Sequence, residues 1–291
     1  MNHYTIKAYA KVNLGLDVIG KLPNGYHQVK MIMQSIDLKD ELTLRITEGS
    51  NVLTTDSDEL PPSEDNLILR AASLMEETYS LNGWGVGIHL RKNIPVAAGM
   101  AGGSADAAAT MKAMNVLFGL NVPHRELMDL AVSIGADVPY CILGGTALAE
   151  GIGEQLTALP PLPSCHILIA KPDISVSTKY VYEHLDSAGI RHHPDIDGGV
   201  AAIREGSLAG VLSRMENVLE SVTIPAYPVI EAIKGRMLEL GAAASLMSGS
   251  GPTVFGIFTE KAAAENGFRQ LKTEGLAKQV FLTVPVNSLR I

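Results

Sequence analysis

The sequence predicts an α+β fold in two domains, and three observations lead to this prediction. Apolar residues make up 46% of the 291 residues and charged residues 19%, which is enough for a hydrophobic core and excludes a disordered chain. Strand-like and helix-like segments are mixed without a regular strand–helix–strand period. The run Pro160-Pro161-Leu162-Pro163 is stiff and poor in backbone donors, so we place a boundary there between domains 1–159 and 160–291.

The N-terminal half begins with strands. An extended segment over 4–20 is rich in Val, Ile, Tyr and Thr and ends before the turn signal Pro23-Asn24-Gly25. Apolar patterning predicts further strands at 29–37, 41–47 and 85–91. Helices are expected at 66–80, at 105–117 with Ser104 as the N-cap, and at 124–134. The segment 144–158 predicts a strand pair that turns at 151–153.

The C-terminal half mixes both element types. We expect strands at 166–170 and 279–285, a hairpin over 244–258, and helices at 177–187, 208–221, 227–240 and 260–273. The segment 189–199 contains His192, His193 and Asp195 and predicts a flexible, solvated loop. A metal site there is disfavoured because no regular spacing defines a coordination geometry.

The charge balance excludes some classes of protein. A net charge of −8 disfavours a general nucleic-acid binder, although local N–H groups and a few cations can still hold a small phosphorylated ligand. Cys141 and Cys165 form no C-x-x-C motif and predict buried free thiols in a reducing cytoplasm. The uncharged stretch 240–259 holds four glycines and a proline, which disfavours a membrane span. No protein partner is evident.

One run of small residues predicts a phosphate site. Residues 95–108 lead directly into an Ala-rich helix, so that backbone N–H groups at its start can converge on an anion. The run lacks the lysine of a Walker A loop, and Ala101 replaces the second glycine of the dinucleotide fingerprint. A tight packing turn remains the alternative. A second loop at 248–253 is either a hairpin turn or part of the same ligand site.

Three polar residues stand in apolar surroundings. Lys11 and Asn13 are two positions apart on a predicted strand and therefore share a face. Asp137 precedes the apolar run 138–142, and its carboxylate either caps a turn or pairs with a partner group. If Lys11 and Asp137 meet, the carboxylate can orient or deprotonate a hydroxyl while the ammonium stabilises a transferred phosphoryl group. An edge-strand charge is the alternative for Lys11.

Four motifs, in this order, resemble those of the GHMP kinases. They are Lys11-x-Asn13-Leu14, the run 95–108, Gly135-Ala136-Asp137-Val138-Pro139, and Ser248-Gly249-Ser250-Gly251-Pro252-Thr253. Within that superfamily, the segment 10–16 followed by Asn24-Gly25-Tyr26-His27 is similar to the branch that phosphorylates a cytidine-diphosphate-linked methylerythritol.

The resemblance implies a fold and a reaction. It implies an N-terminal domain like ribosomal protein S5 domain 2 and a ferredoxin-like C-terminal domain. It also implies ATP and Mg²⁺ as cofactors, with the 2-hydroxyl of the methylerythritol part as the phosphoryl acceptor in the non-mevalonate route to isoprenoids. The alternatives are a kinase of the homoserine or mevalonate type, or a ligand sensor of the same fold without catalysis.

The resemblance further assigns roles to residues. Lys11 and Asp137 match the catalytic pair, and Ser104 matches the hydroxyl on the Mg²⁺ side of ATP. The residues of the ATP phosphate loop are Pro95, Val96, Ala97, Ala98, Gly99, Met100, Ala101, Gly102, Gly103, Ser104 and Ala105. The residues expected to contact the substrate are Asn13, Tyr26, His27, Thr178 and Tyr182. Alanines at 98, 101 and 105 depart from the family pattern and keep the N–H groups accessible if their φ angles stay negative.

Overall fold

The computed structural model describes residues 3–60, 63, 65–190 and 192–288, and these form two compact units. The first unit contains 3–10, 38–96 and 101–143, and the second contains 11–37, 97–100 and the described residues from 144 onward. Two long strands, β1 (His3–Lys21) and β2 (His27–Glu48), contribute residues to both units.

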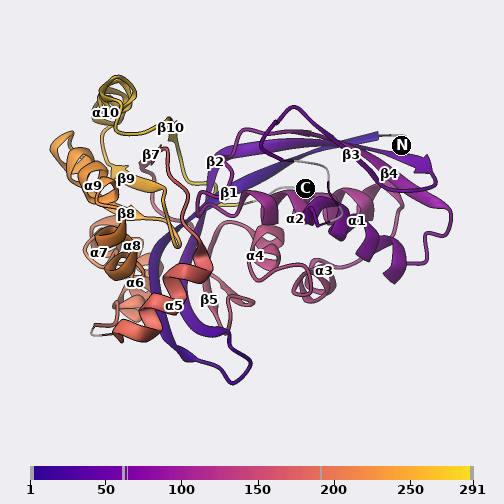
Figure 1. Ribbon diagram of the computed structural model, residues 1–291, viewed down its shortest axis with the longest axis horizontal. Coiled ribbons are helices and arrows are strands. Elements are labelled where there is room, and N and C mark those ends of the chain that lie inside the picture. The colour runs from indigo at the N-terminus through magenta and orange to yellow at the C-terminus, as the bar shows by residue number, and fades with distance from the viewer. Residues whose placement is uncertain (1–2, 61–62, 64, 191, 289–291) are drawn as a thin grey trace. The chain divides into compact units, whose positions relative to one another are not determined.

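The first unit combines strands of a sheet with helices that lie between residues 67 and 143 (Figure 1). Its part of β2 pairs antiparallel with β4 (Trp84–Arg91), from Glu41 opposite Arg91 to Glu48 opposite Trp84. The short strand β3 (Val52–Thr55) runs parallel to β4. The helices α1 (Leu67–Thr78) and α4 (Val138–Leu143) both pack on α2 (Gly102–Leu117), and α3 (His124–Ala131) packs on α4.

Residue size explains how these helices pack. Asn66 begins α1, because its side chain accepts the N–H of Ile68 at 2.9 Å. Helix α2 buries a series of alanines together with Met111 and Met114. Small side chains let neighbouring helices approach closely while the methionines fill the remaining space. The start of α2 is therefore held inside the first unit.

The second unit contains a four-stranded antiparallel sheet. The strand order is β10-β7-β9-β8, formed by β7 (His166–Lys171), β8 (Ala244–Met247), β9 (Val254–Phe258) and β10 (Gln279–Thr283). Helices α9 (Val229–Glu239) and α10 (Lys261–Glu274) pack on this sheet (Figure 1). This order of two strand–helix–strand repeats is the ferredoxin-like arrangement that the family resemblance implies.

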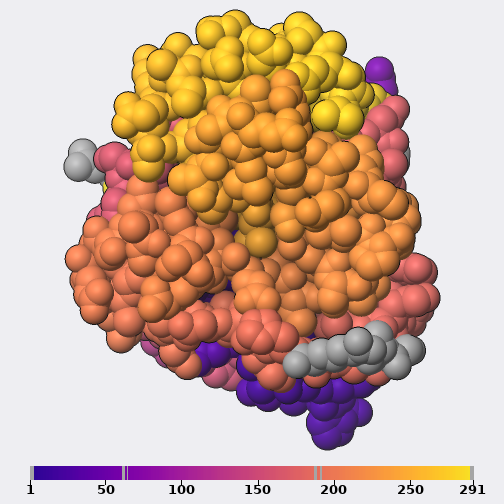
Figure 2. Space-filling model, turned by 90° about the vertical axis from the view of Figure 1, so that its left-hand side faces the viewer, coloured from indigo at the N-terminus to yellow at the C-terminus, as the bar shows by residue number. Residues whose placement is uncertain are grey.

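The remaining elements of the second unit flank that sheet. Strand β5 (Thr146–Glu150) pairs with β2 from Met31 to Gln34 and with β6 (Gln155–Ala158). Between β7 and β8 lie α5 (Thr178–Ala188), α6 (Ile196–Arg204), α7 (Leu208–Leu212) and α8 (Glu220–Ala226). Figure 2 shows the face of this unit on which the orange helices and the yellow α10 form the surface.

Most predicted elements are confirmed, and three expectations are wrong. The strands expected at 29–37 and 41–47 are one strand, β2, because buried Asp40 bonds to neighbouring N–H groups instead of ending the strand. The helix expected at 208–221 is divided into α7 and α8, since Asn217 turns its side chain to the backbone of 247–249. The loop expected at 189–199 ends in α6, which Asp195 caps; Arg191 lies outside the described residues.

The thiols are buried, as the sequence predicts, and the histidines of the 189–199 segment have separate partners. Both cysteines are buried and neither is in a disulfide, and burial raises the pKa of Cys165 to about 12. His192 contacts Glu216 and His193 contacts Asp17, so each histidine has a different partner. Over the described ranges, no three His, Cys, Asp or Glu side chains gather as metal ligands would. None of the described helices is both long and apolar enough to cross a membrane.

Candidate active site

The buried pair Lys11 and Asn13 lies on β1. The two side chains share a face, as predicted, and Lys11 Nζ donates to Asn13 Oδ1 at 2.8 Å. Asn13 Nδ2 donates in turn to Met31 Sδ at 3.2 Å. Lys11 is only 4% exposed, so the alternative of a solvated edge-strand charge is wrong. A buried ammonium oriented by an amide is the arrangement expected of a functional lysine.

Two small-residue loops touch each other in the second unit. The Lys11 N–H donates to Met100 O at 3.1 Å, which ties β1 to the first loop. Gly99 has φ +71°, and a Cβ there would collide with Ser248 O and lie 3.1 Å from Gly251 O. Ser248 Oγ also donates to Gly99 O at 3.0 Å. The loop at 248–253 is thus both a hairpin turn and a direct support of the first loop.

Side chains from α5, α8 and the segment before α8 hold the second loop. Asn217 Nδ2 donates to Met247 O at 2.9 Å and to Gly249 O at 2.8 Å. Thr223 Oγ1 donates to Ser250 O at 3.4 Å, and Thr178 Oγ1 lies 2.8 Å from Ser250 Oγ. Thr178, expected at the substrate, is therefore joined to the loop that supports the phosphate run.

The start of α2 differs from the prediction in two ways. The helix begins at Gly102, so Ser104 lies in its first turn and is not the N-cap. The N-cap is Ala101 with φ +54°, and Ala97 has φ +50°, so the condition of negative φ is not met at Ala101. No side chain among the described residues caps this helix start. Its first N–H groups consequently match the arrangement that binds an anion.

A buried cluster of charges supports the strand that leads into the loop. Asp40 Oδ1 accepts the N–H groups of Asn93 at 2.5 Å and Ile94 at 2.8 Å. Lys92 Nζ bonds to Asp40 and, at 3.0 Å, to Asp106 Oδ2 on α2. No sequence motif predicted this cluster, because Asp40 and Asp106 lie 52 and 14 residues from Lys92.

This cluster shifts the pKa of its members. Burial, with a further contribution from Asp40, raises the pKa of Asp106 to about 8 against the opposing effect of Lys92. Burial by itself would lower the pKa of Lys92, but the two carboxylates outweigh it and the pKa is raised. Asp106 Oδ1 is buried without a hydrogen-bond partner in the described part of the chain. A retained proton on Asp106 relieves the repulsion between the two carboxylates.

Tyr26 and His27 follow the tight turn between β1 and β2. The Leu22 N–H donates to Tyr26 O at 2.7 Å, and the Tyr26 N–H donates to Asn24 Oδ1 at 3.1 Å. The ring of His27 lies 4.7 Å from that of Tyr182, with the planes inclined by 34°. Tyr182 lies one turn after Thr178 on α5. The structure therefore brings His27 and Tyr182 together, with Thr178 one turn away on α5, while Tyr26 is exposed.

Most of the other predicted site residues belong to the first unit. Asp137 is half-buried immediately before α4, and its carbonyl accepts the Cys141 N–H at 3.1 Å. Of the phosphate run, Pro95, Val96 and residues 101–105 lie in this unit, whereas 97–100 lie in the second. Ser104 is half-buried in the first turn of α2.

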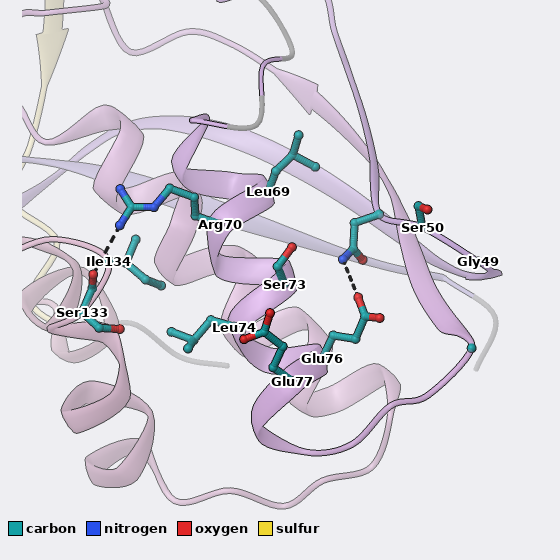
Figure 3. Close-up of a pocket in the computed structure, with 12 residues that line it drawn as sticks. Gly49, Ser50, Leu69, Arg70, Ser73, Leu74, Glu76, Glu77, Ser133 and Ile134 are labelled. Atoms are coloured by element: carbon teal, nitrogen blue, oxygen red, sulfur yellow. Dashed lines mark hydrogen bonds between the residues drawn. The ribbon is translucent and has the colours of Figure 1, made fainter.

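A separate hollow of about 800 Å³ lies in the first unit beside α1 (Figure 3). Its polar side chains largely bond within its own wall: Asn51 Nδ2 donates to Glu76 Oε2 at 2.9 Å, and Arg70 Nη2 donates to Ser133 O at 3.3 Å. None of the predicted site residues lines it. We assign no role in the reaction to this hollow.

Comparison with known proteins decides the family. The family model described as "GHMP kinases N terminal domain" matches residues 66–145, and the model "GHMP kinases C terminal" matches residues 200–277. A protein of Lachnospira eligens named 4-diphosphocytidyl-2-C-methyl-D-erythritol kinase is 56% identical over 97% of this chain and 98% of its own length. The chain belongs to the GHMP kinases. As a member it is an ATP-dependent phosphotransferase.

Further relatives of this GHMP kinase agree. A protein of the same name from Lachnoclostridium phytofermentans is 52% identical over 97% of both chains. A crystal structure of 4-(cytidine 5'-diphospho)-2C-methyl-D-erythritol kinase superimposes with a TM-score of 0.80 at 32% identity, covering 97% of this chain and 99% of the other. A homoserine kinase from Cytophaga hutchinsonii, with TM-score 0.74, 22% identity and coverage of 98% and 95%, shares the fold. The predicted two-domain α+β fold is confirmed.

We predict that Asp106→Asn changes how stability depends on pH. The raised pKa means that the folded protein keeps a proton that the unfolded chain releases near the ordinary carboxyl pKa. This stabilisation is complete at low pH and is lost as the pH rises through about 8, by at most about 1.4 kcal/mol per pH unit. Urea unfolding of both proteins between about pH 5 and pH 8 measures the difference. Parallel curves would contradict the assignment.

We predict that Gly99→Ala disables the loop, and Gly119→Ala is its matched control. Both glycines have positive φ, +71° and +62°, but a Cβ at 119 meets no atom within 4 Å. The control should lose about 1 kcal/mol from backbone strain and keep full turnover. Gly99→Ala should in addition displace the backbone at 248–251 and lower ATP-dependent turnover at least about tenfold. Equal effects of the two substitutions on turnover would show that the loop contact is dispensable.

Proposed function

We propose that this chain transfers the γ-phosphoryl group of ATP to the 2-hydroxyl of the methylerythritol part of 4-diphosphocytidyl-2-C-methyl-D-erythritol. The observation that supports this substrate most directly is the packing of His27 against Tyr182, on the helix whose Thr178 joins the second glycine loop. Paired rings are suited to a planar base, and the names of the 56% and 52% identical relatives include a diphosphocytidyl group.

The phosphate run would hold the ATP phosphates through backbone N–H groups. The uncapped start of α2 offers Gly102, Gly103 and Ser104 as its first helical residues. The hydroxyl of Ser104, half-buried in that turn, fits a role on the Mg²⁺ side of the phosphates. Mg²⁺, when bound, would neutralise charge on the β- and γ-phosphates.

Lys11 and Asp137 would act on the acceptor side. Asp137 would orient the 2-hydroxyl and receive its proton as the oxygen bonds to the γ-phosphorus. The bond from that phosphorus to the bridging oxygen breaks, and ADP leaves. Lys11, held by Asn13, would stabilise the attacking oxygen and the transferred group, while Asn13 faces the substrate.

The substrate's base and diphosphate would lie beside Tyr26, His27, Thr178 and Tyr182. In this proposal domain 1–159 provides the phosphate run and the catalytic pair. Domain 160–291 provides the second loop, Thr178 and Tyr182. We place the reaction in the cytoplasm, where ATP is present and buried thiols stay reduced, and propose no nucleic-acid, membrane or obligate protein partner.

A kinase of the homoserine or mevalonate type is the alternative activity. Such proteins share this fold at 22% and 17% identity, which supports the fold alone. Their substrates contain no nucleobase, so the pairing of His27 with Tyr182 favours the cytidine substrate. A sensor without catalysis is disfavoured because Lys11 and Asp137 are both present.

A substrate panel tests the proposal. Phosphate transfer from ATP is measured with the diphosphocytidyl substrate, homoserine and mevalonate at equal concentrations. We expect the diphosphocytidyl substrate to give a kcat/KM at least about a hundredfold higher than the other two, because only it carries the base. Tyr26→Ala should raise its KM and leave the KM for ATP unchanged. Preferential use of homoserine or mevalonate would refute the proposed substrate.

We predict that Asp137→Asn lowers kcat by at least about a hundredfold and leaves ATP affinity nearly unchanged, because the carboxylate acts on the acceptor hydroxyl. Single-turnover kinetics and ATP binding by calorimetry separate the two effects. Asp173→Asn, a surface carboxylate paired with Lys278, serves as the control for charge removal and should retain activity. Parent-level turnover in Asp137→Asn would show that Asp137 is not catalytic.

A further inference from the structure

The ring of His27 is held by a carboxylate that no motif predicted. His27 Nε2 lies 2.7 Å from Asp186 Oδ1, across 159 residues of sequence. The other carboxylate oxygen of Asp186 accepts a hydrogen bond from Lys21 Nζ at 2.6 Å. The His27 side chain is only 11% exposed, so this contact determines how the ring is presented. All three residues belong to the second unit.

The chemistry of this contact fixes where the imidazole proton lies. Hydrogen bonds from Lys21 and His27 lower the pKa of Asp186, so its carboxylate is ionised and can only accept hydrogen bonds. Nε2 must therefore be the donor. In a neutral imidazole the other nitrogen, Nδ1, then carries a lone pair and acts as an acceptor. Among the described residues, Nδ1 of His27 has no hydrogen-bond partner.

A hydrogen-bond acceptor at Nδ1 of His27 can distinguish a cytosine base from a uracil base. Cytosine presents an exocyclic amino group, which donates, where a uracil-type base presents a carbonyl oxygen, which accepts. The lone pair on Nδ1 attracts the first group and repels the second. A site built to bond to one polar group rejects the analogue that leaves a buried polar atom unpaired.

We infer that Asp186, supported by Lys21, is a positioning residue that holds His27 in the Nε2–H tautomer and thereby selects a cytosine over a uracil base. This inference rests on the proposed function, because it places the base of the substrate beside His27. Tyr182, whose ring lies 4.7 Å from the imidazole, supplies an aromatic surface at the same place. Asp186 itself need not touch the substrate.

The test compares the diphosphocytidyl substrate with its diphosphouridyl analogue, which differs only in the base. The parent should prefer the cytidine form by at least about tenfold in kcat/KM. Asp186→Asn can donate its amide N–H to Nε2 and so favours the opposite tautomer. Its preference should fall to about twofold or less through a higher KM for the cytidine substrate, with the KM for ATP unchanged.

Two further variants separate positioning from a structural role. Asp186→Glu keeps the carboxylate and should restore most of the preference. Asp173→Asn removes a carboxylate from another surface pair, with Lys278 at 2.8 Å, and should leave the preference unchanged. Equal loss of activity with both substrates in Asp186→Asn, at an unchanged ratio, would mean that Asp186 only anchors α5, and the inference would be wrong.

Nitrogen NMR of the imidazole tests the tautomer without any turnover. The His27 signals, assigned by their loss in His27→Gln, should show a protonated Nε2 and an unprotonated Nδ1 in the parent at mildly alkaline pH. Asp186→Asn should move the proton to Nδ1. An unchanged tautomer would overturn the inference. If the parent phosphorylates neither nucleotide substrate, the proposed function fails, whereas the tautomer result still decides the role of Asp186.

Discussion

The close approach of two backbones at Gly99 is the constraint on which the second unit's part of the site depends. Carbonyl oxygens of Ser248 and Gly251 occupy the space that any side chain at 99 would need. Because these loops touch, whatever holds one of them also holds the other. Asn217 holds the second loop through two carbonyls, and Met100 joins the first loop to β1 beside Lys11. Because Gly99 has no side chain, the two loops can touch. The Met100 carbonyl in the first loop then connects the phosphate run to the predicted catalytic lysine.

The net charge of −8 does not show where the positively charged side chains lie. Lys11 and Lys92 are both largely buried, and each bonds to a neighbouring side chain that keeps its ammonium in position. Burying an ammonium is unfavourable unless such partners are present. A polyanionic ligand can therefore be bound by local charges and N–H groups in a chain that is acidic overall.

Local patterns predicted most of the fold, and the errors have physical causes. The gap between the strands expected at 29–37 and 41–47 contains Asp40, which lies buried inside β2 because it bonds to Lys92 and two N–H groups. Ser104 resembled an N-cap because serine is common there, yet the chain enters α2 through Ala101 in a left-handed conformation. Alanine rarely adopts that conformation, so only the packing of the loop could reveal it.

By itself the sequence determined the order of the motifs, and with it the family, because each motif is a short run whose chemistry is local. It also placed Lys11 and Asn13 on one face, since strand geometry alternates side chains regardless of context. Only the tertiary structure decided that Asp186 holds His27 and that Lys92 joins Asp40 to Asp106. These partners are separated by 159, 52 and 14 residues, and hydrogen bonds across such distances depend on how the chain folds back on itself.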